Sequence, residues 1–151
     1  MVAEVDATFR TIPARDARAI GGNSMGGHGA MQLAMNYPER FSVVGMHSPT
    51  LRDYPSAPAY FGDQSYFEAH DPISLVRARP TVARSFRLWL DDGDQDGWLP
   101  PVLAFHQELQ TLDVPHEFQV LPGIHEDEYW TAHLDRYLQF YSRALAPEPV
   151  R

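Results

Sequence analysis

Short apolar segments alternate with amphipathic segments along this chain of 151 residues. The short apolar segments predict buried strands, and they lie at residues 17–22, 41–46, 86–90 and 116–121. The amphipathic segments repeat apolar residues every three or four positions, which predicts helices, and they lie at residues 2–12, 25–36, 99–112 and 126–145. Residues 49–63 are rich in Pro, Ser and Ala and predict a loop, and residues 65–79 predict one or two short helices broken at Pro72.

This alternation determines the expected fold class. Strands that are separated by helices cannot form hairpins, so they pair in parallel and the helices cover the sheet. We therefore expect a three-layer α/β/α sandwich with a parallel sheet of about four strands, in a single domain over residues 1–151. Ligands of such sheets bind beyond the carboxyl ends of the strands, so chemistry is expected just after residues 22, 46, 90 and 121.

A G-x-S-x-G motif follows the first predicted strand. It reads Gly22-Asn23-Ser24-Met25-Gly26, with a helix expected directly after it. A sharp strand-to-helix turn of this kind exposes a serine hydroxyl, and glycines beside it let neighbouring backbone approach closely. The turn predicts Ser24 as a nucleophile and the backbone N–H of Met25 as a donor to a developing oxyanion.

A serine nucleophile needs a general base and an acid that orients the base. The third predicted strand leads into Asp91-Asp92-Gly93-Asp94-Gln95-Asp96-Gly97, and the last strand ends at a glycine turn before His125. We expect His125 to be the base, because the other histidines precede the acid cluster, lie within helices or have no evident partner. Asp96 is the first candidate for the acid and Asp94 the second.

The same acid cluster opens like a calcium-binding loop, but the glutamate that should close such a loop is replaced by Leu103. No histidine pair has the spacing of a zinc protease, so no metal site is expected.

The motifs resemble those of the α/β-hydrolase superfamily, and within it the putative esterase family that includes esterase D and feruloyl-esterase-like proteins. The resemblance rests on residues 20–30, 37–41, 93–96, 115–117, 122–125 and 129–130. It implies carboxylic-ester hydrolysis through an acyl-enzyme, without a cofactor, and its acid position matches Asp96. The chain resembles the C-terminal half of the family. Only 23 residues precede Ser24, which leaves no room for the strands and the loop that supply the second oxyanion donor.

This resemblance also implies an exposed sheet edge at about residues 17–22, along which we expect the chain to form a homo-oligomer. Three functions stay open: a serine esterase acting on small acyl esters, a catalytically weak remnant that serves as an assembly or binding module, and an acyltransferase with the same triad. For the esterase, Tyr60, Phe61 and Trp98 are candidates for the substrate pocket, although the aromatic residues of the loop are equally compatible with simple packing.

The overall composition excludes several partners. A formal net charge of −8 argues against nucleic-acid binding. No apolar run approaches the ~20 residues of a membrane span. The chain has no cysteine, which excludes disulfides and a cysteine nucleophile. The acidic start does not resemble a secretory signal, so a cytoplasmic location is expected.

Overall fold

The computed structural model describes residues 1–145, so the predicted domain boundary at residue 151 lies outside the described residues. The elements follow one another in the order α1 (Val2–Thr8), η1 (Arg15–Ala17), β1 (Ala19–Asn23), α2 (Met25–Asn36), β2 (Val43–His47), η2 (Tyr54–Ser56), η3 (Ala59–Phe61), α3 (Gln64–Glu68), α4 (Pro72–Ala78), α5 (Pro80–Ala83), β3 (Arg87–Gly93), α6 (Leu99–Thr111), β4 (His116–Leu121) and α7 (Asp127–Leu145). The four strands form one parallel sheet in the order β1-β2-β3-β4. The expected α/β fold with a four-stranded parallel sheet is therefore confirmed.

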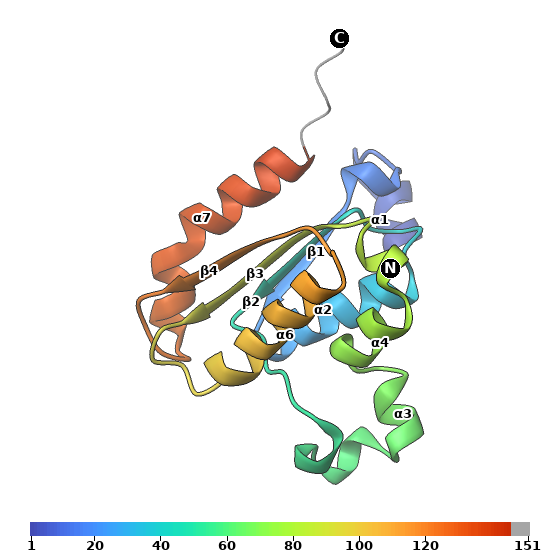
Figure 1. Cartoon of the computed structure of the whole chain (residues 1–151). Coiled ribbons are helices and arrows are strands. Elements are labelled where there is room, and N and C mark those ends of the chain that lie inside the picture. Colours follow the sequence, from blue (N-terminus) through green and yellow to red (C-terminus); the bar gives the residue numbers. More distant parts are fainter. Residues whose placement is uncertain (146–151) are drawn as a thin grey trace.

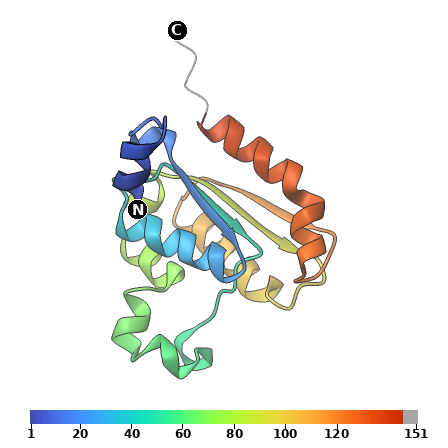
Figure 2. The same cartoon turned by 180° about the vertical axis from the view of Figure 1, so that it is seen from behind.

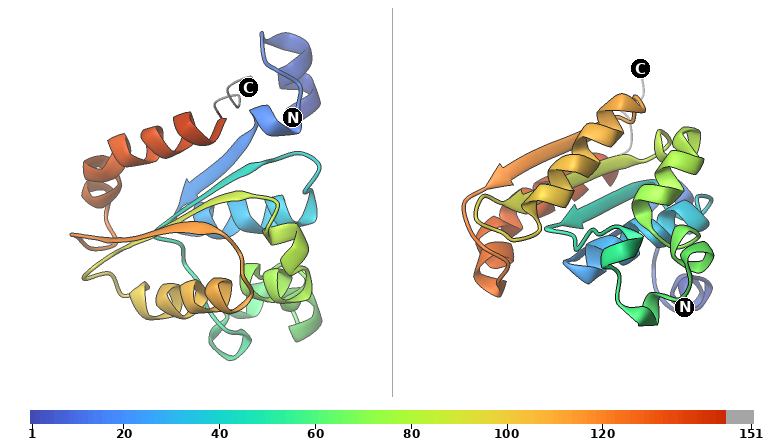
Figure 3. Two further views of the ribbon diagram at one scale, coloured as in Figure 1. Left: turned by 45° about the horizontal axis from the view of Figure 1, so that its top comes forward. Right: turned by 60° about the horizontal axis from the view of Figure 1, so that its bottom comes forward.

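Helices cover the two faces of the sheet unequally. The long helix α7 lies across one face, and α2 and α6 lie on the other, as Figure 1 and the view from behind in Figure 2 show. Figure 3 shows the same three layers from two further directions. The helices α3 and α4 extend from the layer of α2 and carry the connection from β2 to β3.

Side chains of the central strands alternate between these two layers, as a period of two requires. Val44 and Met46 of β2 join the larger cluster with α2, α4 and α6. Val43 and Trp89 instead join the smaller cluster with α7. Because both faces of β2 are covered, every residue of this strand is buried.

Gly45 explains how α7 approaches the sheet so closely. A Cβ atom at this position would lie 1.9 Å from the Tyr141 hydroxyl oxygen, and one at Gly21 would lie 1.8 Å from it. Both glycines thus leave the space in which the tyrosine of α7 lies against the sheet.

Several sequence predictions differ from the structure: the first three strands are shifted by one to three residues at their ends, so that β3 includes Asp91 and Asp92, and two short 3-10 turns lie within the expected loop. The helix expected at residues 2–12 ends at Thr8, and Phe9 continues in an extended conformation. None of the residues of α1 is buried, and a short helix depends on such packing for its stability. The short helix α5 was not expected, and Pro80 occupies its first turn, where proline is favourable.

The strand β1 lies at one edge of the sheet, as expected for residues 17–22. Self-association along this edge stays a prediction. No helix within residues 1–145 is both long enough and apolar enough to span a membrane.

Candidate active site

Ser24 occupies the turn between β1 and α2. Its backbone has φ 55° and ψ −122°, a strained conformation for a residue with a side chain. Gly22 makes the turn possible, because a Cβ atom there would lie 2.6 Å from the backbone carbonyl carbon of Gly26. Gly26 itself would accommodate a Cβ atom without a contact within 4 Å. Of the two motif glycines, only Gly22 thus lies where a side chain would clash with neighbouring backbone.

Two further residues of the motif border the serine. Asn23 ends β1 and is exposed, and Met25 opens α2. The backbone N–H of Met25 belongs to the first turn of a helix, where N–H groups have no partner within the helix. This N–H is therefore available to an anionic oxygen that forms beside Ser24.

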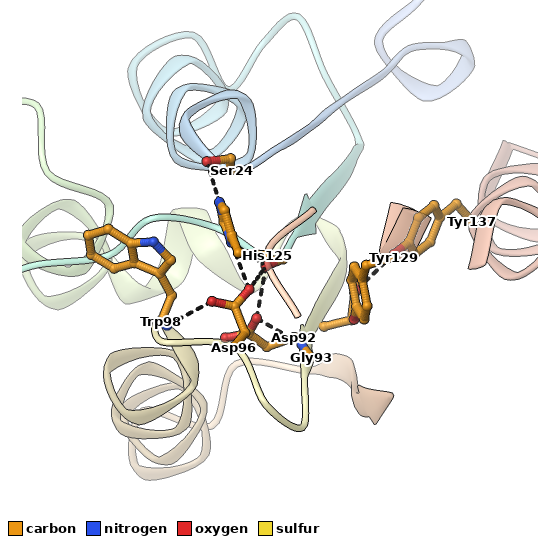
Figure 4. A network of polar contacts seen from close by, with 10 residues as sticks. Ser24, Asp92, Gly93, Asp96, Trp98, His125, Tyr129 and Tyr137 are labelled. Carbon is orange, nitrogen blue, oxygen red and sulfur yellow. Dashed lines mark hydrogen bonds and ion pairs between the residues drawn. The ribbon is translucent and has the colours of Figure 1, made fainter. Parts of the chain in front are cut away.

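His125 joins Ser24 to Asp96, three residues that come from loops far apart in the chain (Figure 4). The imidazole Nε2 lies 2.8 Å from Ser24 Oγ, and the imidazole Nδ1 lies 2.7 Å from Asp96 Oδ2. A carboxylate at Nδ1 favours the tautomer that carries its proton there, which leaves Nε2 free to accept the serine proton. The arrangement can therefore deprotonate an attacking hydroxyl group.

The two candidate acids have different partners. Asp94 Oδ1 accepts a hydrogen bond of 3.0 Å from the backbone N–H of Gly123, and this carboxyl is exposed. The Asp96 side chain is fully buried and is the one that contacts His125. The geometry thus favours the first candidate, and Asp94 instead connects the loop after β3 to the loop after β4.

Burial acts to raise the pKa of Asp96, but hydrogen bonds outweigh it. Ser48, the backbone N–H of Trp98 and His125 all contact this carboxyl, and together they lower its pKa below the ordinary value. Asp96 is therefore held in the ionised form that orients an imidazole.

Ser48 and Asp92 are two site residues that the sequence analysis did not identify. Ser48 Oγ lies 2.9 Å from Asp92 Oδ1, 2.5 Å from Asp96 Oδ2 and 3.0 Å from His125 Nδ1. Burial, together with the neighbouring carboxyl of Asp96, raises the pKa of Asp92 to about 7. Ser48 follows β2 at the carboxyl end of the sheet, where functional residues were expected. Its position after this strand could therefore have identified it from the sequence.

A separate polar cluster lies on the α7 side of the sheet, around the fully buried Asp91. Its carboxyl accepts hydrogen bonds from Trp89 Nε1 at 2.5 Å, Tyr129 Oη at 2.7 Å and Tyr137 Oη at 3.0 Å, and it contacts His47 Nδ1 at 3.0 Å. These contacts connect β2, β3 and α7. His47 therefore belongs to this structural cluster, and not to the site at Ser24.

The three residues expected to form a substrate pocket lie in different surroundings. Trp98 lines a cavity of about 530 Å³ between η2, α4 and the start of α6. Phe61 does not line this cavity, although its ring lies beside the guanidinium of Arg52. Tyr60 is 77% exposed and also lies outside it.

The aspartates of the cluster do not all converge on one point. Asp92 and Asp96 both contact the hydroxyl of Ser48, whereas Asp94 contacts the backbone N–H of Gly123. Within residues 1–145, no group of three or more carboxylate or histidine side chains is arranged to hold a metal ion.

A parallel sheet with a strained serine turn at its carboxyl edge, followed by an aspartate and then a histidine, defines the α/β-hydrolase class. Residues 1–141 match the sequence model of the family described as "Putative esterase", and the chain belongs to this family.

Individual relatives agree with this assignment. An S-formylglutathione hydrolase of Paracoccus denitrificans (strain Pd 1222) is 35% identical over an alignment of 99 residues, which covers 60% of this chain and 34% of the relative. Esterase Rv1288 of Mycobacterium tuberculosis (strain ATCC 25618 / H37Rv) is 29% identical, over 80% of this chain and 33% of its own length. A solved ferulic acid esterase has a TM-score of 0.81 and 29% identity, covering 95% of this chain and 57% of that one. The match spans about a third of the length of the two curated relatives, the hydrolase and Esterase Rv1288.

Proposed function

We propose that this chain is a serine carboxylic-ester hydrolase that acts on small acyl esters through an acyl-enzyme. The observation that carries the proposal is the pair of hydrogen-bond distances of 2.8 Å and 2.7 Å that join Ser24, His125 and Asp96. Membership of an esterase family supports the same reaction class.

The reaction would follow from this geometry in two steps. Ser24 Oγ attacks the ester carbonyl carbon while His125 Nε2 takes its proton, and the backbone N–H of Met25 stabilises the oxyanion. The bond to the alcohol then breaks, and His125 returns the proton to the leaving oxygen. Water attacks the acyl-enzyme by the same route and regenerates Ser24.

The test compares the wild type with Ser24→Ala on 4-nitrophenyl acetate and butyrate. We expect the substitution to lower kcat by about 10⁴-fold or more. Ser142→Ala, which changes an exposed serine of α7, is the matched control and should keep the wild-type rate. A fluorophosphonate should label the wild type and the control but not Ser24→Ala. Equal rates in all three proteins would exclude Ser24 from the reaction.

A further inference from the structure

Arg52 lines the cavity of about 530 Å³ that lies beside the candidate active site. Two contacts near the lining residues Leu51 and Trp98 connect this cavity to the candidate active site. The backbone N–H of Thr50 donates to the carbonyl oxygen of Ser24 at 3.3 Å, and the backbone N–H of Trp98 donates to Asp96 Oδ1 at 2.8 Å. Figure 4 shows Trp98 and Tyr129 on opposite sides of His125. A group bound in this cavity would thus lie on the Trp98 side of the reacting serine.

The Arg52 side chain is held between two aromatic rings. Its guanidinium carbon lies 4.8 Å from the centre of the Trp98 ring and 5.5 Å from the centre of the Phe61 ring. Such contacts orient a guanidinium and leave its edge, where the N–H donors lie, available to a ligand. The side chain is therefore positioned before any ligand binds, which reduces the entropy lost on binding.

This guanidinium is not satisfied by the protein around it. Its Nε is buried and has no hydrogen-bond partner. Within residues 1–145, no ion pair involves Arg52. The positive charge of Arg52 is therefore not neutralised by an ion pair with a described residue and can attract an anion in the cavity.

The other charged groups that line the cavity do have partners. Arg77 forms an ion pair with Glu108 at 2.8 Å. Asp53 accepts from Ser56 on the exposed surface, and Glu68 accepts from Gln64 at 2.8 Å. Within residues 1–145, neither Asp53 nor Glu68 forms an ion pair with Arg52.

Asp71 is the remaining polar group of the cavity. Its Oδ2 accepts from the backbone N–H and the hydroxyl of Ser74, whereas its Oδ1 is buried without a partner. Burial raises the pKa of Asp71 above its ordinary value, although the hydrogen bonds from Ser74 act to lower it. Among the described residues that line the cavity, Arg52 is thus the cation without an ion-pair partner, and an oxyanion is a suitable ligand for its guanidinium.

We propose that Arg52 forms an anion subsite and that the preferred ester substrates carry a carboxylate, which binds to its guanidinium in this cavity. The proposal rests on the esterase function proposed above, since the subsite lies beside Ser24. The carboxylate can belong to the acyl group or to the alcohol, and a charge-assisted hydrogen bond to Arg52 would recognise it in either case.

Matched pairs of esters test the preference and identify the source of the carboxylate. The acyl pair is 4-nitrophenyl hemisuccinate and its methyl ester, and the alcohol pair is 4-acetoxybenzoate and its methyl ester. We expect the wild type to prefer the anionic member of one pair, and Arg52→Gln to lower kcat/KM for that member by about ten- to a hundredfold, mainly through KM. The neutral member should change by less than about threefold.

Two further variants separate charge from packing. Arg52→Lys keeps the charge but loses the planar fork, so it should retain part of the preference. Arg77→Gln removes a cation that lines the same cavity but is paired with Glu108, and should leave the ratio of the two rates unchanged. If Arg52→Gln lowers both members of each pair equally, or if Arg77→Gln abolishes the preference as well, the subsite is excluded.

A binding measurement distinguishes this proposal from the esterase function. Glutarate titrated calorimetrically into the Ser24→Ala variant should bind, and Arg52→Gln in that background should weaken the affinity by about tenfold or more. Arg52-dependent binding without hydrolysis by the wild type would retain the subsite and overturn the esterase. Hydrolysis that does not distinguish anionic from neutral esters, together with no glutarate binding, would retain the esterase and overturn the subsite.

Discussion

Replacing Asp92 with asparagine should stabilise the protein at alkaline pH but not at acidic pH. The Asp92 residue is fully buried at the end of β3, and its Oδ2 has no hydrogen-bond partner. Burial and the neighbouring Asp96 disfavour its charged form and raise its pKa to about 7 from an ordinary value of 3.8. The native state therefore holds a proton that the unfolded chain releases.

The sign and the size of the effect follow from this difference. Between about pH 4 and pH 7 the native state binds more protons than the unfolded state, so the free energy of unfolding decreases as the pH rises. About three pKa units at ~1.36 kcal/mol each set a ceiling of ~4 kcal/mol. Because the titration of Asp92 is linked to that of the neighbouring Asp96, and because solvent screens part of the interaction, we expect roughly 1–2 kcal/mol of this ceiling. Asp96, whose pKa is lowered, contributes only to the loss of stability below about pH 4.

The assay is reversible unfolding in urea, followed by circular dichroism at pH 5 and pH 8. Asp92→Asn should match the wild type at pH 5 and exceed its free energy of unfolding by roughly 1–2 kcal/mol at pH 8, which raises Tm by about 2–8 °C. Asp94→Asn, on the exposed part of the same loop, is the control and should not stabilise the protein at pH 8. A variant that is less stable than the wild type at pH 8, or a difference that is equal at both pH values, would refute the reasoning.

Three further substitutions test other parts of the structure. Asp96→Asn should lower kcat for 4-nitrophenyl acetate by about 10⁴-fold because it favours the wrong imidazole tautomer, whereas Asp94→Asn should stay within about tenfold; equal losses would reject Asp96 as the acid. Tyr129→Phe removes one donor from the buried Asp91 carboxyl and should cost about 1–3 kcal/mol in urea unfolding, and an unchanged midpoint would show that this hydrogen bond contributes nothing. Gly45→Ala should lower Tm by about 5 °C or more or prevent folding, because its methyl group would lie 1.9 Å from a tyrosine hydroxyl of α7; wild-type stability would contradict this close packing.

The sequence by itself determined the elements and their order. The limits of α2 and β4 agree with the prediction at both ends, because glycine, proline and apolar periodicity act over a few neighbouring residues. The helices between the strands predicted parallel pairing. Parallel pairing in turn predicted that the functional residues would lie at the carboxyl edge of the sheet. The motif at Ser24 and the glycine turn before His125 could be recognised for the same reason, since a turn is defined by adjacent residues.

Only the tertiary structure decided which side chains meet. Asp94 and Asp96 stand two positions apart in one loop, and their sequence surroundings favour neither strongly. The fold brings Gly123 to the first and His125 to the second. The partners of Ser48 and Arg52 likewise come from a distant loop. Asp96 contacts Ser48, and the ring of Trp98 contacts Arg52. Contacts between distant segments depend on how the layers pack, and no local pattern of residues encodes that arrangement.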